Sequence, residues 1–388
     1  MSNLEKRTAL MNSIFCFGSS LVSMFITVYL YIYADSIPLM SLYIIVRIGL
    51  FPLFFILGNK LSKKYPFSLT YFLGLSMISV ALAITLFGSS LFESNPYYVL
   101  LIAAIIGSGE GFFYFSQNTC NQIVSSAETR GKFLSYNGFL NNIFSLLSPI
   151  VASFILARSV SELSGYRVIL VIIIAVFIVV LMMSLKMNIR SLDNNVSLSK
   201  AFDNSDKMWR DHNLAVLFYG FRNALELNTI SILVYNAAGN GGAYSKLQVF
   251  FSFILIIAYR IIGKMLSKDS ISGTIKIGVI LKIVCLMALV LIPNTIGAII
   301  YGITNALAMV FYDNSYNYLS ANIICRYEGE MTARVVVRET YLSIARCISM
   351  GFIILCYKVL PGNIYLQVST ILIAFTPIVV ERILIQYK

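Results

Sequence analysis

The chain has 388 residues, of which 58% are hydrophobic and only 12% are charged. Soluble proteins carry about 25% charged residues, so the composition excludes a soluble globular protein and indicates a polytopic membrane protein. The formal net charge of +12 does not call for a nucleic-acid partner, because membrane proteins concentrate Lys and Arg in their cytoplasmic loops.

The cysteine pattern points away from metal and disulfide chemistry. The six cysteines lie in or at the ends of apolar segments, and none of them has the CxxC spacing that is typical of metal or redox sites. We therefore expect no metal, no disulfide framework and no cofactor. The first apolar run, about 10–33, is too long for the core of a signal peptide and is predicted to be the first membrane span.

The first half of the chain contains six predicted spans. A membrane-spanning helix needs about 20 apolar residues. Lys6 and Arg7, which precede the first span, place the N-terminus in the cytoplasm. The six spans are about 10–33, a second that ends near 57, about 67–92, a fourth that contains 107–122, about 133–157 and about 168–185.

A polar segment follows and divides the chain into two halves, 1–186 and 213–388. This segment, 187–212, contains the only tryptophan and the only histidine, Trp209 and His212. We interpret it as a cytoplasmic linker with Trp209 at the membrane interface. A regulatory or partner-binding site is the alternative interpretation.

Six further spans are predicted in the second half. They are about 214–235, one that leads to Arg260, one that ends at Pro293-Asn294, about 296–324, one that ends at Lys358, and one that ends near Arg382. Twelve spans return the C-terminus to the cytoplasm, and most Lys and Arg then fall on the cytoplasmic side.

An internal repeat relates the two halves. Gly58–Lys63 matches Gly263–Lys268, and Thr129-Arg130 corresponds to Ala333-Arg334. Both matches have nearly the same offset, and each occupies the same place in its half. The halves are therefore predicted to be parallel six-helix repeats, with a substrate path between them near the midplane.

Charged residues near the centres of spans are candidate functional residues, because a charge there costs about 2.5–3.5 kcal/mol on insertion scales. These residues are Arg47, Glu110, Arg222, Glu226, Asp313 and Arg346. Arg222 and Glu226 share a helix face, while sequence alone leaves open whether Arg47 and Glu110 pair across two helices. Glu110 and Asp313 are candidates for proton coupling or substrate binding, and the alternative is that they are structural, hydrogen-bonded acids.

The fourth span has a polar face. Glu110, Tyr114, Gln117 and Asn121 recur at i, i+4, i+7 and i+11, so they line one side of a helix. Three glycines near Glu110 predict close approach of a neighbouring helix, which would bring Arg47 within reach of the carboxylate. These glycines are Gly107, Gly109 and Gly111.

Amide and phenol side chains mark a predicted amphipathic cavity. Asn137 and Asn141 share a face of the fifth span, and Asn305, Tyr312 and Tyr316 crowd the tenth. Together with Tyr114, Gln117 and Asn121 they are predicted to line the cavity, because they combine donors, acceptors and apolar surface. The alternative is hydrogen bonding between helices.

Local motifs resemble those of a known family. The loop after the second span has the family's glycine, leucine and lysines at Gly58, Leu61, Lys63 and Lys64. Ser62 stands where an acidic residue is usual, and Pro149 fits an exporter signature that has glycine where Ser148 stands here. With two six-span halves and a long central loop, the whole chain resembles the major facilitator superfamily.

Shorter stretches are similar to the poorly characterised YqgE-like branch of bacterial transporters. They are Gly109–Tyr114, Glu128–Arg130 followed by Asn137-Gly138, and Val337–Leu342 with Arg346. The resemblance implies an all-α fold of twelve transmembrane helices in two pseudo-symmetric halves. It also implies that the first, fourth, seventh and tenth spans line the cavity and the ninth is peripheral. Lys282, in or near the ninth span, has no obvious place in that scheme, whereas Lys276 can extend to the membrane surface.

The leading interpretation is a secondary active transporter that works by alternating access and exports a small organic or amphipathic compound, coupled to protons. A flippase for a lipid or lipid-linked molecule is the alternative. A membrane-embedded enzyme is a remote alternative, because the chain lacks HExxH and Gly-x-Ser-x-Gly motifs. We expect a monomer in a bacterial cytoplasmic membrane, with substrate, protons and lipid as partners and no nucleic acid.

Overall fold

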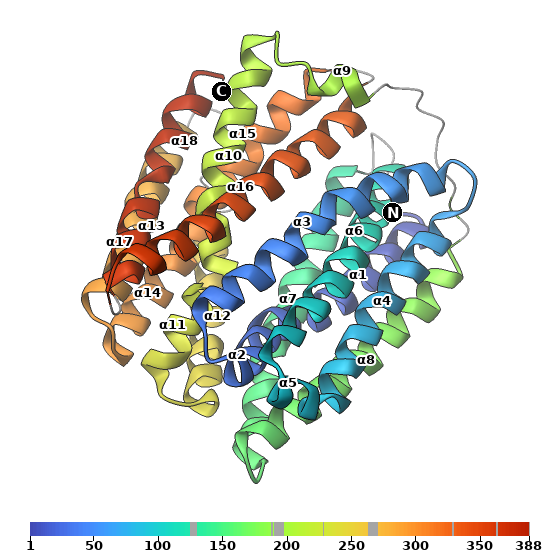
Figure 1. Ribbon diagram of the computed structural model, residues 1–388. Helices are drawn as coiled ribbons and strands as arrows, with labels where there is room; N and C mark the ends of the chain where they lie inside the picture. The colour runs from blue at the N-terminus through green and yellow to red at the C-terminus, as the bar shows by residue number, and fades with distance from the viewer. Residues whose placement is uncertain are drawn as a thin grey trace. The chain divides into compact units, whose positions relative to one another are not determined.

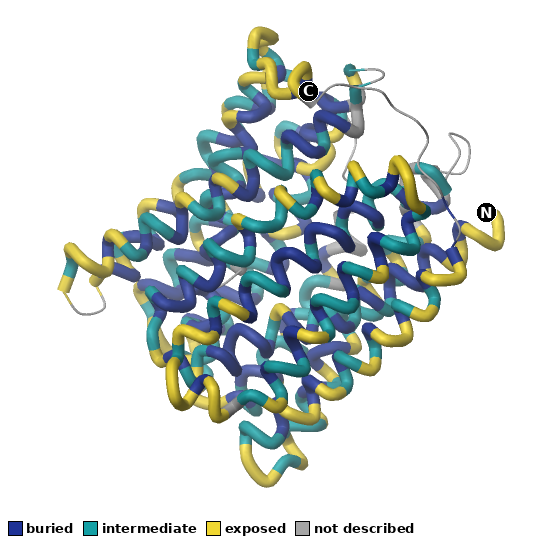
Figure 2. Tube along the Cα trace, turned by 45° about the vertical axis from the view of Figure 1, so that its right-hand side comes forward, coloured by how far each residue is buried: buried dark blue, intermediate teal, exposed yellow. Residues whose placement is uncertain are grey.

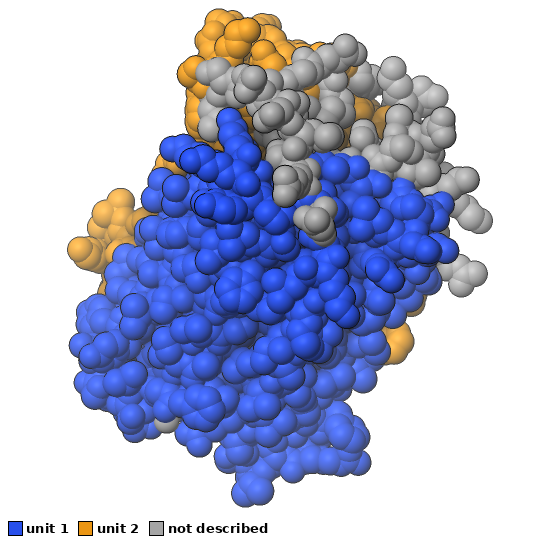
Figure 3. Space-filling model, turned by 90° about the vertical axis from the view of Figure 1, so that its right-hand side faces the viewer, with its two compact units in different colours: residues 1–194 blue, residues 195–388 orange. Residues whose placement is uncertain are grey.

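A computed structural model describes residues 1–124, 130–187, 189, 198–227, 229–262, 271–327, 330–361 and 364–387 (Figure 1). The described residues form helices joined by short segments, with no strand among them. Glu128, Thr129, the repeat segment Gly263–Lys268 and linker residues 190–197 lie outside the described residues. The chain divides into two compact units, residues 1–194 (unit 1) and 195–388 (unit 2), which Figure 3 shows in different colours.

Unit 1 is built from six long helical segments. The first consists of α1 (Asn3–Leu21), a π-helical segment η1 (Val22–Ile26) and α2 (Thr27–Ala34). The others are α3 (Ile37–Ser62), α4 (Phe67–Phe87), α6 (Val99–Val124), α7 (Arg130–Arg158) and α8 (Glu162–Leu185). Short helices α5 (Ser89–Ser94) and η2 (Pro96–Tyr98) connect α4 to α6.

Unit 2 begins with the short helix α9 (Leu198–Phe202). Its longer elements are α10 (Lys207–Leu227), α11 (Thr229–Ala238), α12 (Gly241–Ile262), α13 (Ile271–Leu291), α14 (Thr295–Ala308), the π-helical segment η3 (Met309–Asp313), α15 (Asn314–Cys325), α16 (Met331–Val359), α17 (Ile364–Ala374), α18 (Thr376–Leu384) and η4 (Ile385–Tyr387).

Ten helical segments in the described part of the chain are long and apolar enough to cross a membrane. They fall at the positions of the predicted spans 1–6 and 9–12, which confirms a multi-pass, all-α membrane protein. The positions of the seventh and eighth predicted spans are occupied by α10 with α11 and by α12. At those two positions the count of twelve spans stays a prediction.

Capping residues explain where several helices begin and end. Ser161 accepts a hydrogen bond from the Ser164 backbone N–H in a capping arrangement, so α8 begins at Glu162 rather than near residue 168. At the other end of unit 1, α4 stops before Gly88, and the predicted span 67–92 is therefore split between α4 and α5. Helix α10 is already helical from Lys207, so it extends beyond the predicted seventh span, which begins at about 214.

The same pairs of helices pack together in both units. In unit 1, α1 packs on α7 and α8, α6 packs on α3 and α4, and α4 packs on α8. In unit 2, α10 packs on α16 and α18, α14 packs on α12 and α13, and α13 packs on α17. Each of these pairs in unit 2 occupies the same place in its half as the corresponding pair in unit 1, as expected for a repeat. The number of six membrane spans in each half stays a prediction.

The outward faces of the helices are apolar. On α8, Val171, Ile178 and Met182 are exposed, whereas Ile173 and Phe177 are buried. Figure 2 shows this mixture of exposed and buried positions along the helices. An exposed apolar face suits contact with lipid, because hydrocarbon offers no hydrogen-bond partners to polar side chains.

Candidate functional site

In unit 1, Arg47 of α3 and Glu110 of α6 form a bidentate ion pair. Nε of Arg47 donates to Oε2 of Glu110 (2.9 Å), and Nη2 donates to Oε1 (2.5 Å). The two side chains keep exposed fractions of 15% and 19%. The parallel, two-bond geometry is the strongest that an arginine and a carboxylate can form. The structure thus settles the pairing that the sequence left open.

Glycines of α6 allow this pair to form, as predicted from the sequence. A Cβ atom on Gly107 would lie 1.9 Å from the carbonyl oxygen of Arg47. On Gly111 it would lie 2.7 Å from the carbonyl oxygen of Phe51, also on α3. Gly109 faces the other way, toward α4. The missing side chains let the α3 and α6 backbones touch, which brings the Arg47 guanidinium beside Glu110.

Asn12 joins α1 to α6 and α7 through a cluster of amides. Its Nδ2 donates to Oδ1 of Asn121 (2.8 Å) and Oδ1 of Asn137 (3.0 Å). Its Oδ1 accepts from Nε2 of Gln117 (3.1 Å). Sequence reasoning missed Asn12, although a polar side chain inside an apolar span is a signal for hydrogen bonding between helices.

The seam between α1 and α7 is polar as well. Ser13 Oγ donates to Asn141 Oδ1 (2.9 Å), and the hydroxyl of Ser148 donates to the carbonyl oxygen of Phe17 (2.9 Å). Tyr114 contacts the ring of Phe15 edge-on, with 5.8 Å between centroids. The predicted polar residues of the fourth and fifth spans therefore hold helices of unit 1 together, and their place in a cavity stays a prediction.

In unit 2, four charged side chains form one cluster, called here the charge cluster: Arg222, Glu226, Lys282 and Asp313. Arg222 of α10 donates from Nη1 to Oε1 of Glu226 and from Nη2 to Oδ1 of Asp313 (2.9 Å). Lys282 of α13 contacts Glu226 Oε1 at 2.9 Å and Asp313 Oδ2 at 3.0 Å. The predicted pairing of Arg222 with Glu226 is confirmed, and the two positive and two negative charges balance.

Local backbone geometry brings Asp313 and Lys282 together. Asp313 lies in η3, and π-helical segments of this kind are frequent at functional sites. Gly278, one turn before Lys282 on α13, would place a Cβ atom 2.5 Å from the backbone nitrogen of Tyr312. The close crossing of α13 and η3 therefore depends on Gly278. In unit 1, Gly74 of α4 has the same role against the backbone of α6.

The positively charged side chains of the cluster are more deeply buried than the negatively charged ones. The side chains of Arg222 and Lys282 are 0% exposed, whereas those of Glu226 and Asp313 are 16% exposed. Taking a charge out of water costs several kcal/mol, and the ion must then be paired. The cations are held on the protein side of the cluster, and the carboxylates form its accessible side.

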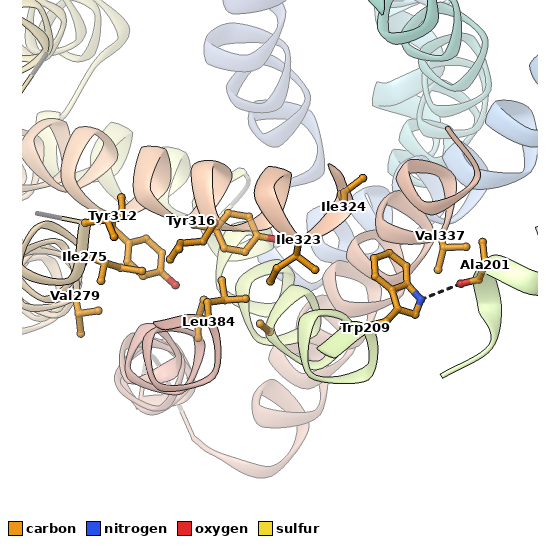
Figure 4. Close-up of a cluster of buried hydrophobic side chains, with 14 of the residues drawn as sticks. Ala201, Trp209, Ile275, Val279, Tyr312, Tyr316, Ile323, Ile324, Val337 and Leu384 are labelled. Carbon is orange, nitrogen blue, oxygen red and sulfur yellow. Dashed lines mark hydrogen bonds between the residues drawn. The ribbon is translucent and has the colours of Figure 1, made fainter. Parts of the chain in front are cut away.

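Tyrosines surround the guanidinium of Arg222. Its central carbon lies 5.2 Å from the ring centroid of Tyr219 and 5.1 Å from that of Tyr312. Tyr219 stacks on Tyr316 with 3.7 Å between centroids. Tyr312 and Tyr316 are buried in the hydrophobic core of unit 2, as Figure 4 shows. Their predicted contact with a cavity stays a prediction.

Arg346 and Asn305 take different positions around α10 and α13. Arg346 of α16 donates from Nε to Oδ1 of Asn223 on α10 (2.9 Å). Asn305 of α14 accepts a hydrogen bond from Nζ of Lys282 (3.0 Å) and so belongs to the surroundings of the charge cluster.

Lys282 is the member of the charge cluster that the sequence analysis did not select. Its sequence position places it in or near the ninth span, and the family resemblance implies that this span is peripheral. The rule that a charge within the membrane marks a functional site would have included it.

Trp209 does not have the outward position expected of a residue at the membrane interface. Its indole is fully buried, and Nε1 donates to the carbonyl oxygen of Ala201 (2.9 Å; Figure 4). It stacks on the ring of His212, and the guanidinium of Arg334 lies 4.5 Å from its centroid. The indole packs inside unit 2 because the end of the predicted linker folds into its core, and the place of Trp209 at the level of the membrane interface stays a prediction.

Burial also determines the charge of His212. Loss of solvent around the ring, together with the positive charge of Arg338, lowers the pKa of His212 to about 3. The imidazole is therefore neutral at physiological pH, and its Nε2 shares a hydrogen bond with Oγ of Ser320 (2.8 Å).

Comparisons with known proteins agree with this architecture. The model of the Major Facilitator Superfamily matches residues 8–324. The uncharacterized protein YqgE of Bacillus subtilis (strain 168) is 24% identical over 366 residues, which are 92% of this chain and 83% of that protein.

Solved transporter structures are similar in fold. The crystal structure of the nucleoside transporter NupG has a TM-score of 0.71 at 11% identity, and the match covers 100% of this chain and 99% of that one. A POT family transporter in complex with 5-aminolevulinic acid has a TM-score of 0.71 at 12% identity, with 99% and 96% covered. At such identities these structures show the fold alone. The match to the family model over residues 8–324 shows that this multi-pass membrane protein belongs to the major facilitator superfamily.

Proposed function

We propose that the protein is a secondary active transporter that works by alternating access and couples the export of a small organic or amphipathic compound to protons. The observation that carries the proposal is the charge cluster of unit 2, in which two buried cations and two partly exposed carboxylates balance. A structural core rarely contains four such charges, because each one costs free energy to bury.

Charge balance links the proton state of this cluster to the packing of helices. Adding or removing one proton leaves a net charge among Arg222, Glu226, Lys282 and Asp313, where the surroundings screen charge poorly. The same four side chains join α10, α13 and η3. A change in protonation therefore favours a different arrangement of these helices, and a coupled transporter needs such a link between ion binding and conformation.

The ion pair of unit 1 supports the same proposal. Arg47 and Glu110 are partly exposed and join α3 to α6. Protonation of Glu110 would remove the charge that holds Arg47. We assign to these two residues, to Arg346 and to the charge cluster the roles of proton coupling or substrate binding.

We further propose that the protein acts as a monomer in the bacterial cytoplasmic membrane with both termini in the cytoplasm. The basic residues Lys6 and Arg7 before the first span support this orientation. The predicted linker, residues 187–212, is proposed to lie on the cytoplasmic side, with its last residues, from Lys207 on, forming the start of α10.

Proton movement in everted membrane vesicles tests the proposal. Vesicles carrying the protein are acidified inside, and an acridine dye reports loss of the gradient as members of a panel of organic compounds are added. At least one compound should release protons with the wild type, and Asp313→Asn and Glu110→Gln should reduce that release. Glu93→Gln is the matched control, because Glu93 is exposed in α5.

If both carboxylate variants release protons like the wild type, their proposed role is wrong. If lipid analogues cross the bilayer faster with the protein and no compound releases protons, the flippase interpretation replaces export of a solute.

A further inference from the structure

The ammonium group of Lys282 occupies a site made of three oxygen atoms from three elements. Its Nζ lies 2.9 Å from Oε1 of Glu226 on α10 and 3.0 Å from Oδ2 of Asp313 on η3. It also donates to Oδ1 of Asn305 on α14 (3.0 Å). A lysine ammonium has three N–H donors and no acceptor, so the three oxygens match it one for one. We call these three side chains the ammonium site.

The accessible side of this site is negative. Glu226 and Asp313 are partly exposed, whereas Lys282 and Arg222 are fully buried behind them. Among the described residues, both ion pairs of Glu226 use its Oε1 atom. An approaching ligand therefore meets the side chains of the two acids before it meets either cation. This order of burial favours a positively charged ligand over an anion.

A ligand cation would upset the charge balance of the cluster. The four charges sum to zero, and a fifth charge that is positive would leave a net charge in surroundings that screen it poorly. Arg222 cannot lose its proton in a protein. Lysine can, because a buried ammonium that loses its counter-ions is less stable than the neutral amine. Lys282 is thus the cation that can restore neutrality.

We propose that the charge cluster binds an organic cation with an ammonium group, and that Lys282 releases one proton in exchange. The ligand ammonium takes over contacts with Glu226 and Asp313, and the neutral amine of Lys282 remains beside Asn305. One N–H bond of Lys282 breaks, its electron pair stays on Nζ, and the proton leaves to water. The exchange balances as one cation bound and one proton released, and its place in a transport cycle rests on the proposed function.

The polar and titratable groups around Lys282 come from the helices that surround the charge cluster. They are Tyr219, Arg222 and Glu226 of α10, Tyr244 of α12, Cys285 of α13, Tyr301 and Asn305 of α14, and Tyr312 and Asp313 of η3. Glu226 and Asp313 are the acids that contact Lys282 directly. A ligand ammonium that takes over the contacts of these two carboxylates would separate them from Lys282.

Titration calorimetry of the purified full-length protein tests the exchange without any gradient or transport. Hexylammonium is the probe, and hexanoate has the same chain length with the opposite charge. Measuring in two buffers with different ionisation enthalpies counts the protons released per probe bound. The wild type should bind hexylammonium in preference to hexanoate and release about one proton, so its Kd should fall tenfold for each unit of rise in pH.

Variants of Lys282 separate its role from general effects on folding. Lys282→Arg keeps the positive charge but cannot release a proton, so hexylammonium should bind at least tenfold more weakly and release none. Lys282→Met should still bind the probe, with no proton release and a Kd that does not vary with pH. Lys276→Met, on the exposed side of the same helix, should behave like the wild type.

The inference is overturned if the wild type does not bind hexylammonium, binds it without releasing a proton, or prefers hexanoate. Proton release that persists in Lys282→Met would also overturn it. These results are independent of the vesicle experiment. If the vesicles show proton-coupled transport and calorimetry shows that Lys282→Met still releases a proton on binding hexylammonium, the proposed function stands and only the role of Lys282 is removed.

Discussion

Lys282 and Asp313 form an ion pair between a helix expected at the periphery of the fold and a helix expected at its centre. Nζ of Lys282 on α13 lies 3.0 Å from Oδ2 of Asp313 on η3, and the lysine side chain is 0% exposed. A fully buried ammonium depends on its partners, because water cannot replace them. This contact makes α13 part of the candidate site.

Removing one member of this pair should destabilise the protein more than removing both. Lys282→Met leaves an excess negative charge, and loss of one partner of a buried pair costs about 3–5 kcal/mol. The double variant Lys282→Met/Asp313→Asn restores neutrality and should recover part of that loss. Thermal unfolding in detergent measures the difference, with Glu93→Gln as an exposed control. A double variant as unstable as the sum of the two single variants would contradict the coupling.

Gly107→Ala should separate α3 from α6. The new methyl group would lie 1.9 Å from the carbonyl oxygen of Arg47, and only backbone movement can relieve this overlap. Overpacking of this kind costs about 1–3 kcal/mol. Gly138→Ala on α7 is the matched control, because no atom lies within 4 Å of its added Cβ. The control should be neutral or slightly stabilising, since alanine favours helix. Equal melting temperatures for the two variants would exclude the close helix contact.

Fluorescence of Trp209 reports whether the indole is buried in the protein, because it is the only tryptophan in the chain. The fully buried ring should emit at short wavelength and resist quenching by acrylamide in water and by brominated lipid in the bilayer. Arg334→Ala removes the guanidinium beside the ring and should increase quenching by acrylamide. Strong quenching by brominated lipid in the wild type would instead place Trp209 at the lipid interface.

Acidification should destabilise unit 2 through His212. In the unfolded chain the imidazole binds a proton below about pH 6.5, whereas its pKa in the folded protein is about 3. Between these values the unfolded state binds more protons, so stability falls as the pH falls, by about 2 kcal/mol at pH 5. Melting curves from pH 7.5 to 5 should show a smaller loss for His212→Gln than for the wild type. Parallel curves would show that His212 does not contribute.

Features that depend on nearby residues could be predicted from the sequence. The length of apolar runs determined the membrane class and the positions of the ten spans. Helical spacing paired Arg222 with Glu226. The glycines of the fourth span predicted close helix contacts, and two of them, Gly107 and Gly111, make the contact with α3 that places Arg47 beside Glu110. The sequence repeat indicated two equivalent halves, and in the structure the same pairs of helices pack together in both halves.

Contacts between distant segments were decided only by the tertiary structure. Asp313 is 91 residues from Arg222, and no local periodicity relates them. The position of Lys282 depends on the crossing of α13 and η3, which Gly278 and the π-helical turn set together. Trp209 is buried because the segment before α10 folds back onto the core. The sequence determined which charges enter the membrane, and the packing of helices decided how those charges neutralise one another, because burial requires partners that only the folded chain supplies.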